Sequence, residues 1–456
     1  MRKSFAAKVA KVARAPSQPV LQYNQEQDEQ QEEVQQQPLQ QWDFSSRRVV
    51  CEASEEFSGV AAAASSSLPC ENNFVKDIHF SPDGTCLLAA SEDCKLRLYE
   101  APDPDRGDGS SSSGAPPWRC CLQYNEGETI YSMAWYPHMS SSTPASCCFV
   151  TTARDHPLHL WCAYTGALRA TYRGYDHLDE LSSALSVAFN AAGTHIWGGH
   201  PGGCLRCWDI TRPGREYQTR STVPKGKKCR GRGQTGLISA LAFAPDGSGL
   251  FAAGAYSRSV CLYDESAAGA YSHSVRLYDE RWSGKGPGVV AELSPGDVKM
   301  GGVTALRWHP DGNRLFSGGR MDDAVVCWDV RSGRAPLRTF ARPAATNQRF
   351  GVDVDASGRY LVTGASDGCA RVHNVASGAL VSALADLPDA VGGVSFSPAA
   401  PLLAVATGQR HFPQCDDDEV HGGDGTEETL LRRNVIRIYD MRGSDRPAQE
   451  AVGMNE

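Results

Sequence analysis

The stretch RWHPDGNRLFSGGRMDDAVVCWDV (307–330) decides the fold of this 456-residue chain. An apolar run meets a Pro-Asp-Gly turn, a second run ends in a turn of small and acidic residues, and a third run ends in Trp-Asp. Closely similar stretches are HFSPDGTCLLAASEDCKLRLYE (79–100) and AFAPDGSGLFAAGAYSRSVCLYDE (242–265). A sheet unit this short cannot bury its apolar faces alone, so the copies must pack side by side.

Each copy reads as strand, turn, strand, turn, strand, because Gly, Pro, Asp and Ser favour bends while Val, Leu, Phe, Tyr and Trp favour strands. Seven strand-ending pairs recur along the chain: Tyr99-Glu100, Trp161-Cys162, Trp208-Asp209, Tyr263-Asp264, Trp328-Asp329, His373-Asn374 and Tyr439-Asp440. Repeats of this kind, about 40–45 residues long, are typical of WD40 blades. We therefore predict an all-β, seven-bladed WD40 β-propeller whose last blade takes its outer strand from the segment 42–57.

The predicted propeller spans residues 72–442, preceded by a closing strand and linker at 42–71. The Gln/Glu-rich tail 1–41 and the tail 443–456 have compositions that predict disorder. Three insertions are expected within the ring, at 101–118, 266–280 and 414–430. The second of them repeats residues 251–265 at 12 of 15 positions. Fifteen residues supply about two of a blade's four strands, so we interpret it as a duplication looped out of one blade, with a sequence error as the alternative.

The charges are unevenly distributed along the chain, and the cysteine usage is that expected of an intracellular protein. Residues 151–410 hold 28 Lys and Arg against 22 Asp and Glu, a net +6, and the remainder is net −14. The 16 cysteines are scattered and many fall on expected strands, so we expect reduced, buried thiols. Cys204 and Cys207 are three apart on one strand and point to opposite faces, which argues against a shared zinc ion. The chain contains no run of 18 apolar residues, so no membrane span is predicted.

Two apparent catalytic motifs lack the structural setting that their chemistry needs. Residues 364–368 match G-x-S-x-G, but a nucleophile elbow leads from a strand into a helix, and here a strand follows. Residues 231–236 match G-x-G-x-x-G, but that fingerprint also opens a helix, and the strand-like LISALAFAP follows instead. We therefore expect no enzyme, no catalytic residue, no metal ligand and no cofactor.

The segment PKGKKCRGRGQTG (224–236) is the most basic part of the chain. Its cations are Lys225, Lys227, Lys228, Arg230 and Arg232. In propeller order it crosses from the outer strand of one blade to the inner strand of the next. A glycine-rich run of cations suits phosphate backbones, whereas a solvated charged loop is the alternative.

Other expected connections on that edge of the ring combine arginine with aromatic or amide side chains. Such combinations bind unpaired bases by hydrogen bonding and stacking, although structural roles are equally compatible with them. The candidates for RNA contact are Arg173, Tyr175, His177, Arg349, Arg410 and Phe412. The acidic insertion 416–428 falls on the same edge and works against a simple anion-binding face.

Several of these segments together resemble the telomerase Cajal body protein family. The segments that carry the resemblance are NFVKDIHFSPDG (73–84), GETIYSMAWY (127–136), TGALRATYRGYDHLDEL (165–181), RPGREYQTRST (212–222), HPDGNRLFSGGRMDDAVVCWD (309–329), TNQRF (346–350) and TGQRHFP (407–413). DHLDEL, TNQR and GQR-x-FP are not general features of WD40 repeats. The duplication at 266–280 and the length of the basic segment depart from the family pattern.

The resemblance implies a non-enzymatic, RNA-binding scaffold in the nucleus, in Cajal bodies, with a cytoplasmic fraction. It implies recognition of the CAB box of small Cajal body RNAs, and possible clients are telomerase RNA with its reverse transcriptase. It also implies association with dyskerin-type H/ACA ribonucleoproteins. The alternative is a general protein-interaction propeller, such as a peptide reader or a ubiquitin-ligase substrate receptor.

Closing the ring joins residues that are far apart in sequence, and such topologies fold slowly. We therefore expect folding to depend on a cytosolic chaperonin. Five residues are expected to act through packing rather than through RNA contact: Phe74, Trp161, Trp208, His309 and Trp328.

Overall fold

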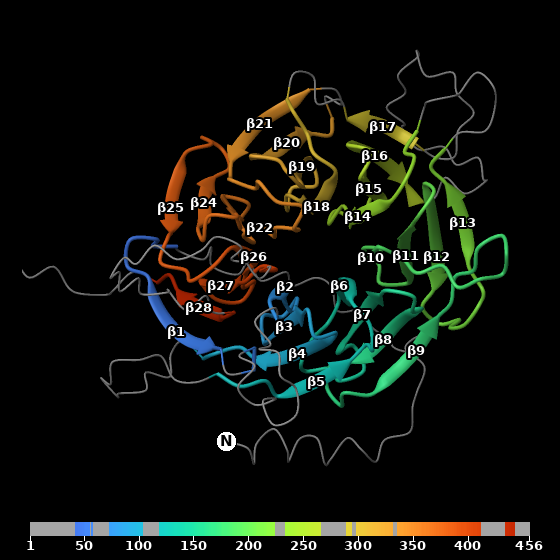
Figure 1. Cartoon of the computed structure of the whole chain (residues 1–456), viewed down its shortest axis with the longest axis horizontal. Helices are drawn as coiled ribbons and strands as arrows, with labels where there is room; N and C mark the ends of the chain where they lie inside the picture. Colours follow the sequence, from blue (N-terminus) through green and yellow to red (C-terminus); the bar gives the residue numbers. More distant parts are fainter. Residues whose placement is uncertain are drawn as a thin grey trace, which may run out of the picture.

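The computed structural model describes residues 42–54, 56–57, 73–103, 118–223, 233–265, 289–293, 298–331, 335–411 and 434–442. These residues form seven four-stranded antiparallel sheets, arranged as blades around a central axis (Figure 1). The predicted seven-bladed β-propeller is therefore confirmed. The described part contains no helix long and apolar enough to cross a membrane. The two tails, the insertions at 266–280 and 414–430 and most of the insertion at 101–118 lie outside it.

Each blade places its first strand nearest the axis and its last strand at the periphery (Figure 1). Blades 1 and 2 contain β2 (Val75–Phe80), β3 (Cys86–Ser91), β4 (Lys95–Glu100), β5 (Leu122–Asn125), β6 (Ile130–Trp135), β7 (Cys148–Ala153), β8 (Leu158–Cys162) and β9 (Leu168–Tyr172). Blades 3 and 4 contain β10 (Ser186–Phe189), β11 (His195–His200), β12 (Cys204–Asp209), β13 (Gln218–Ser221), β14 (Ile238–Phe243), β15 (Leu250–Ala255), β16 (Ser259–Asp264) and β17 (Val289–Leu293). Blades 5 and 6 contain β18 (Val303–Trp308), β19 (Arg314–Gly319), β20 (Ala324–Asp329), β21 (Pro336–Ala341), β22 (Val352–Val354), β23 (Tyr360–Thr363), β24 (Ala370–Asn374) and β25 (Leu380–Leu384).

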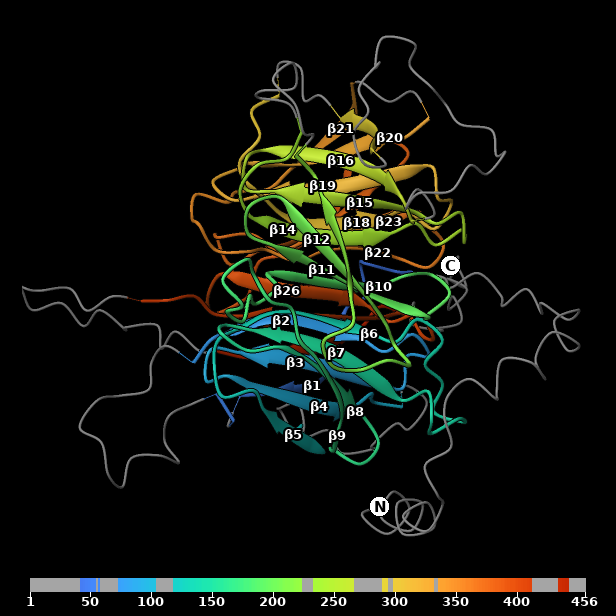
Figure 2. The same ribbon diagram turned by 90° about the vertical axis from the view of Figure 1, so that its right-hand side faces the viewer.

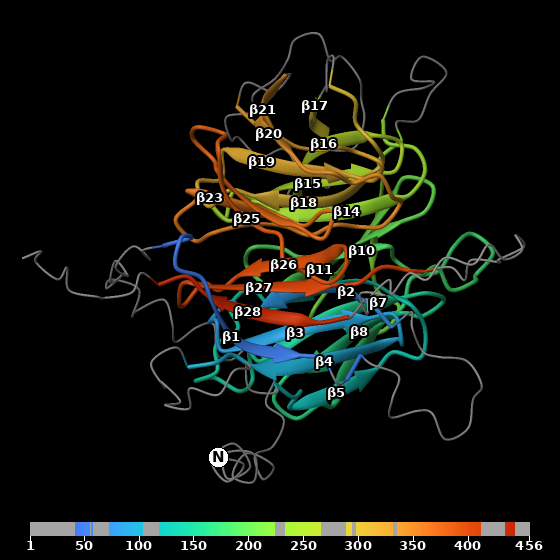
Figure 3. The ribbon, with the colours of Figure 1, turned by 60° about the vertical axis from the view of Figure 1, so that its left-hand side comes forward.

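Blade 7 combines the two ends of the described chain. It contains β26 (Val391–Phe396), β27 (Leu402–Thr407) and β28 (Ile436–Asp440), with β1 (Arg48–Ala53) as its outer strand. β1 pairs antiparallel with β28, and Arg48 lies opposite Asp440. Figures 2 and 3 view the ring from its side, with strands running across the picture and connections gathered along two edges. The pairing of β1 closes the ring without leaving β28 as an open edge.

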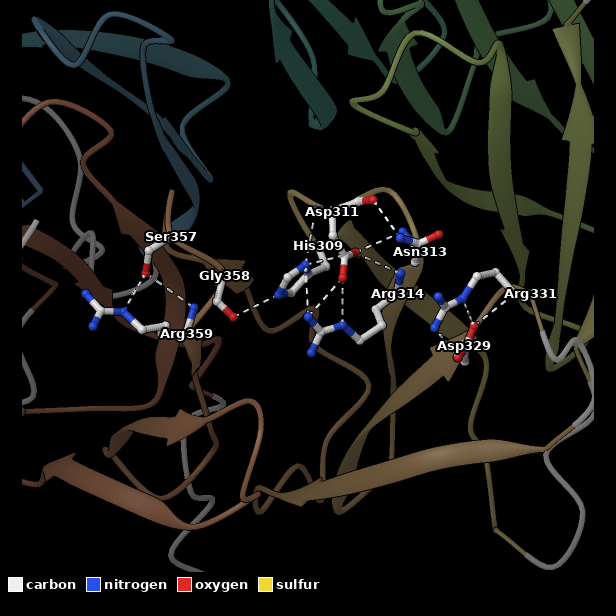
Figure 4. A network of polar contacts seen from close by, with 9 residues as sticks. All are labelled: His309, Asp311, Asn313, Arg314, Asp329, Arg331, Ser357, Gly358 and Arg359. Carbon is white, nitrogen blue, oxygen red and sulfur yellow. Dashed lines mark hydrogen bonds and ion pairs between the residues drawn. The ribbon is translucent and has the colours of Figure 1, made fainter. Parts of the chain in front are cut away.

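The Pro-Asp-Gly-like turns join neighbouring blades. Gly358 has a φ of +73°, and a Cβ atom at this position would lie 2.3 Å from Nε2 of His309. The space is filled by His309 itself, whose Nε2 lies 2.8 Å from the carbonyl oxygen of Gly358 (Figure 4). Gly193 receives the ring of Tyr136 from the preceding blade in the same way. Glycine in this turn therefore serves both the bend and the packing of one blade on the next.

The residues expected to act through packing lie inside the ring, with one exception. Phe74, Trp208, His309 and Trp328 are buried, whereas Trp161 is half-buried. Trp161 is held by hydrogen bonds, because its Nε1 donates to Oε1 of Glu126 at 2.7 Å and lies 3.0 Å from Oγ1 of Thr151.

Candidate nucleic-acid interface

One edge of the ring carries the connections from each outer strand to the next inner strand, together with the turns between second and third strands. Alternation of strand direction places both sets at the same edge, which we call the crossing edge. Its described parts include the connections 126–129, 173–185, 233–237, 342–351 and 385–390 and the turns 92–94, 154–157, 201–203, 256–258, 320–323 and 364–369.

The basic segment emerges from the crossing edge between blades 3 and 4. Its five cations, Lys225, Lys227, Lys228, Arg230 and Arg232, lie outside the described residues. Its ends are held firmly, because the Thr222 hydroxyl lies 2.9 Å from the carbonyl oxygen of Gly203 and 2.7 Å from that of Gln234. The buried Gln234 side chain donates to the carbonyl oxygen of Ala253 at 2.8 Å and accepts from the hydroxyl of Tyr263 at 2.9 Å. The chain thus leaves and re-enters the ring at two fixed points.

Tyr175 lies in the connection between β9 and β10, but its ring is not open to a base on both faces. The guanidinium of Arg215 covers it at 4.0 Å from the ring centroid, and Arg215 also pairs with Asp179. Sequence reasoning missed Arg215, because it belongs to the loop between β12 and β13 and reaches Tyr175 only through blade packing. Arg173 and His177 are exposed on the same connection. Tyr175 therefore packs against Arg215, whereas Arg173 and His177 are exposed to solvent.

A buried pair supports the base of this connection. Nη2 of Arg206 donates to the carbonyl oxygen of Tyr175 at 2.6 Å, and Nη1 lies 3.0 Å from Nδ1 of His200. Burial lowers the pKa of His200 to about 3, and the charge of Arg206 adds to this effect. His200 is therefore neutral at physiological pH and accepts the hydrogen bond from the arginine.

The TNQR segment (346–349) lies in the connection from blade 5 to blade 6 and contacts blades 7 and 1, and we call it the TNQR strap. Nη2 of Arg349 lies 3.1 Å from Oδ2 of Asp77 on β2, and Nε2 of Gln348 donates to the carbonyl oxygen of Gly408 at 3.0 Å. Burial by itself raises the pKa of Asp77, but the charges of Arg349 and His79 outweigh it and hold the pKa at about 2. Arg349 is thus committed to joining blades, in line with the structural alternative for this residue.

The GQR segment, which follows β27 of blade 7, contacts blade 1 and the connection between blades 6 and 7. Arg410 pairs with Glu92, which also lies 3.0 Å from Nζ of Lys76. Nε2 of Gln409 donates to Oδ1 of Asp389 at 2.9 Å, and Nε2 of His411 lies 2.6 Å from Oδ2 of the same residue. The side chain of Arg410 remains 55% exposed despite its pairing, and Phe412 lies outside the described residues.

Cations on blades 2 to 4 of the crossing edge are less engaged than those on blades 6, 7 and 1. Within the described ranges, Arg173 and Arg258 make no ion pair, and Arg154 pairs only with its exposed neighbour Asp155, at 3.6 Å. Half-buried Tyr131 of β6 lies in the electrostatic field of Arg154. Sequence reasoning missed Arg154 and Arg258 as candidates. Both lie in turns before strands that end in Trp-Asp or a similar pair, and such turns are expected on the crossing edge.

The two motif matches lie in turns of the propeller. Ser366 of the G-x-S-x-G match lies between β23 and β24, and its hydroxyl donates to the carbonyl oxygen of Pro343 at 3.2 Å. The described end of the G-x-G-x-x-G match, 233–236, leads into β14. Within the described residues, no group of three or more His, Cys, Asp and Glu side chains is placed to hold a metal ion.

The chain is similar to known proteins over most of its length. The WD domain, G-beta repeat family matches residues 64–100, 227–264 and 296–329. Telomerase Cajal body protein 1 of Homo sapiens is 37% identical over 79% of this chain and 60% of its own length. The Drosophila melanogaster homologue is 31% identical over 78% of this chain and 61% of its own length. The chain belongs to the telomerase Cajal body protein family.

Membership of this family confirms the resemblance that the DHLDEL, TNQR and GQR-x-FP segments indicated. The chain spans about 60% of the length of these curated relatives. It is also 28% identical to the guanine nucleotide-binding protein negative regulator 1 of Schizosaccharomyces pombe, over 66% of this chain and 70% of that protein.

Proposed function

We propose that the chain is an RNA-binding WD40 scaffold that recognises the CAB box of small Cajal body RNAs and directs H/ACA-type ribonucleoproteins to Cajal bodies and telomeres. In this proposal the RNA lies on the sector of the crossing edge over blades 2 to 4. Its phosphates contact Arg154, Arg173 and Arg258 together with the basic segment, and unpaired bases stack beside Tyr131.

One observation carries the location of the RNA. Arg349 and Arg410 are engaged by carboxylates of blade 1, whereas Arg173 and Arg258 have no carboxylate partner among the described residues. A phosphate approaching blades 2 to 4 therefore displaces few existing ion pairs, while one approaching blades 6, 7 and 1 competes with them. The described chain on either side of the basic segment, at Val223 and Gly233, lies in the first sector, so the proposal assigns the five cations of that segment to the same sector.

The proposal extends to partners and location. We propose dyskerin-type H/ACA proteins as assembly partners, telomerase RNA and reverse transcriptase as clients, and the cytosolic chaperonin as a folding partner. The working location is the nucleus, in Cajal bodies, with newly made protein in the cytoplasm. No membrane partner, cofactor or enzymatic activity is part of the proposal.

Charge reversal tests the placement of the RNA. The variant Arg154→Glu/Arg173→Glu/Arg258→Glu should weaken binding to a CAB-box RNA loop, because three phosphate contacts are lost. The slope of log affinity against log salt should flatten by about 2, since each contact on a single strand contributes about 0.7. The matched control is Arg212→Glu/Arg331→Glu/Arg359→Glu, which reverses three exposed arginines of the opposite edge. Equal slopes for wild type and both variants would remove this sector from the RNA path.

A general protein-interaction scaffold is the competing function. WD40 rings commonly present their edges to peptides, and the curated relatives include a protein named as a G-protein regulator. RNase treatment separates the two functions. Under our proposal, H/ACA-type RNAs co-purify with the chain and part of the protein partners is lost after RNase. Retention of all partners with no enriched RNA would favour the protein scaffold.

A further inference from the structure

Cys162 occupies the position at which most other blades carry a carboxylate or an amide at the end of the third strand. The equivalent residues include Asp209, Asp329 and Asn374. Oδ1 of Asp209 accepts a hydrogen bond from the backbone nitrogen of Thr211 at 2.8 Å, and Oδ1 of Asn374 accepts one from Ser377 at 2.9 Å. In blade 2 the side chain that accepts hydrogen bonds from the following turn is the thiol of Cys162, which accepts from Thr165.

The surroundings of Cys162 favour negative charge on that sulfur. Nη2 of Arg169 lies 3.0 Å from Sγ of Cys162, and Arg169 makes no ion pair with any described carboxylate. Burial acts to raise the pKa of Cys162, but hydrogen bonds from Thr165 and the nearby charge of Arg169 outweigh it, and the pKa is lowered. The guanidinium of Arg169 therefore favours the thiolate form of Cys162.

A β-bulge explains why the arginine reaches the sulfur. In the pairing of β8 with β9, Leu160 lies opposite Ala170 and Trp161 lies opposite Leu168, so Arg169 is the extra residue. A bulge of this kind re-aims the side chain of the inserted residue. Arg169 is exposed to solvent, so the sulfur lies one side chain below the surface.

A second cysteine lies directly across the sheet. Cys148 on β7 is the register partner of Cys162 on β8. The backbone nitrogen of Cys148 donates to Ser146 and that of Cys162 donates to Ala167, so the two residues form a non-hydrogen-bonded pair. In such pairs the Cα atoms are about 4.5 Å apart and both side chains project from the same face, which is compatible with a disulfide. Both thiols are free in this structure.

We propose that Cys162 and Cys148 form a peroxide-sensitive thiol pair, with Cys162 as the attacking thiolate and Cys148 as the resolving thiol. The Cys162 sulfur attacks hydrogen peroxide, the O–O bond breaks, and Cys162 becomes a sulfenic acid while the departing hydroxide takes a proton to give water. The Cys148 sulfur then attacks the sulfenic sulfur, and the S–O bond breaks. The leaving hydroxide takes the Cys148 proton, so two thiols and one peroxide yield one disulfide and two waters.

The order of the two steps follows from the difference between the two thiols. Burial raises the pKa of Cys148 to about 11, whereas that of Cys162 is lowered. Cys147 precedes Cys148 in sequence, but its sulfur faces the turn before β7, 3.2 Å from the carbonyl oxygen of Ser140. Cys86 holds the register position of Cys148 in blade 1, but lies opposite Glu100. These two residues supply internal controls.

The test uses the full chain, treated with hydrogen peroxide, quenched with an alkylating reagent, digested with trypsin and chymotrypsin, and analysed by mass spectrometry. The expected product is a peptide pair linked through Cys148 and Cys162, present in wild type and in Cys147→Ala and absent from Cys148→Ala. A linked peptide that persists in Cys148→Ala would overturn the pairing. Oxidation of exposed Cys121 at peroxide concentrations that leave Cys162 reduced would overturn the role of Cys162.

The role of Arg169 is tested by the rate of sulfenic acid formation in a Cys148→Ala background, trapped with dimedone. Arg169→Gln should slow trapping at Cys162 about tenfold, because the thiolate loses its cation. Arg169→Lys retains the charge and should recover part of that rate. Wild-type rates in both variants would show that Arg169 does not activate the thiol.

Discussion

His200 and Arg206 show how single buried residues set the shape of the crossing edge. Arg206 donates to His200 and to the carbonyl oxygen of Tyr175, so the β9–β10 connection rests on a side chain that is itself buried. The contact requires a neutral imidazole, because a protonated ring would place two cations 3.0 Å apart. The protonation state of one histidine is therefore coupled to the geometry of a surface loop.

The substitution His200→Gln should flatten the pH dependence of stability. Folded His200 stays neutral down to about pH 3, whereas in the unfolded chain it binds a proton below about pH 6.5. Acidification from pH 7.5 to 5 therefore favours unfolding of the wild type, by up to about 2 kcal/mol from this residue. The thermal midpoints of wild type and His200→Gln are measured at pH 7.5 and at pH 5. The difference between the two proteins should be smaller at pH 5. The exposed His177→Gln serves as control, and a gap of constant size would contradict the assignment.

At the scale of elements, the connections between blades hold the ring together. The TNQR strap bypasses the neighbouring blade, since it starts after β21 and reaches Asp77 on β2. Gly392 permits its passage, because a Cβ atom there would lie 2.9 Å from the carbonyl oxygen of Val75 and 3.2 Å from Nε2 of Gln348. The strap thus supplements the pairing of β1 with β28 in closing the ring.

Removal of the strap's charge should destabilise the ring more than removal of an exposed pair. Arg349→Gln leaves the buried Asp77 without its arginine, at a cost of about 2–3 kcal/mol, less than for a fully buried pair because Arg349 is partly exposed. Arg410→Gln removes a pair with a largely exposed arginine and should cost below about 1 kcal/mol. Chemical denaturation at pH 7 gives the free energy of unfolding of both variants. Equal losses relative to wild type would show that the pair of Arg349 with Asp77 stabilises the ring no more than the exposed pair does.

The stabilisation by the pair of Arg349 with Asp77 should disappear at low pH. The pKa of Asp77 is held near 2, below its ordinary value of about 3.9, so the contribution of the pair is complete above about pH 4. It is lost as the pH falls through about 2, below which Asp77 is protonated in both the folded and the unfolded state. The difference between Arg349→Gln and wild type should accordingly close in that range.

The repeat predicted the architecture because each turn and strand signal is local. Gly358 illustrates this, since its positive φ follows from a Pro-Asp-Gly-like turn that is legible in the sequence. The candidate site was less predictable, because its contacts join residues from different blades. No local pattern indicates that Arg215 covers Tyr175 or that Arg349 reaches Asp77. Those contacts depend on the order in which blades pack around the axis.

At the scale of the whole molecule, the arginines of the crossing edge are unevenly paired among the described residues. Its arginines over blades 6, 7 and 1 are engaged by Asp77 and Glu92, whereas Arg173 and Arg258 over blades 2 to 4 remain open within the described residues. Under the proposed function, this uneven pairing favours the approach of RNA over blades 2 to 4. Both sectors contain an arginine near an amide or aromatic residue, so they look alike in sequence. Their arginines nevertheless differ in whether they form ion pairs with described carboxylates.

The most direct test of the RNA-binding proposal is ultraviolet crosslinking of the full chain in cells, followed by sequencing of the bound RNA and mapping of the crosslinked peptides. We expect enrichment of H/ACA-type guide RNAs that share a loop motif, with crosslinks concentrated in blades 2 to 4 and the basic segment. Recovery of bulk ribosomal RNA alone, or crosslinks confined to blades 6, 7 and 1, would contradict the proposed function and the proposed RNA path respectively.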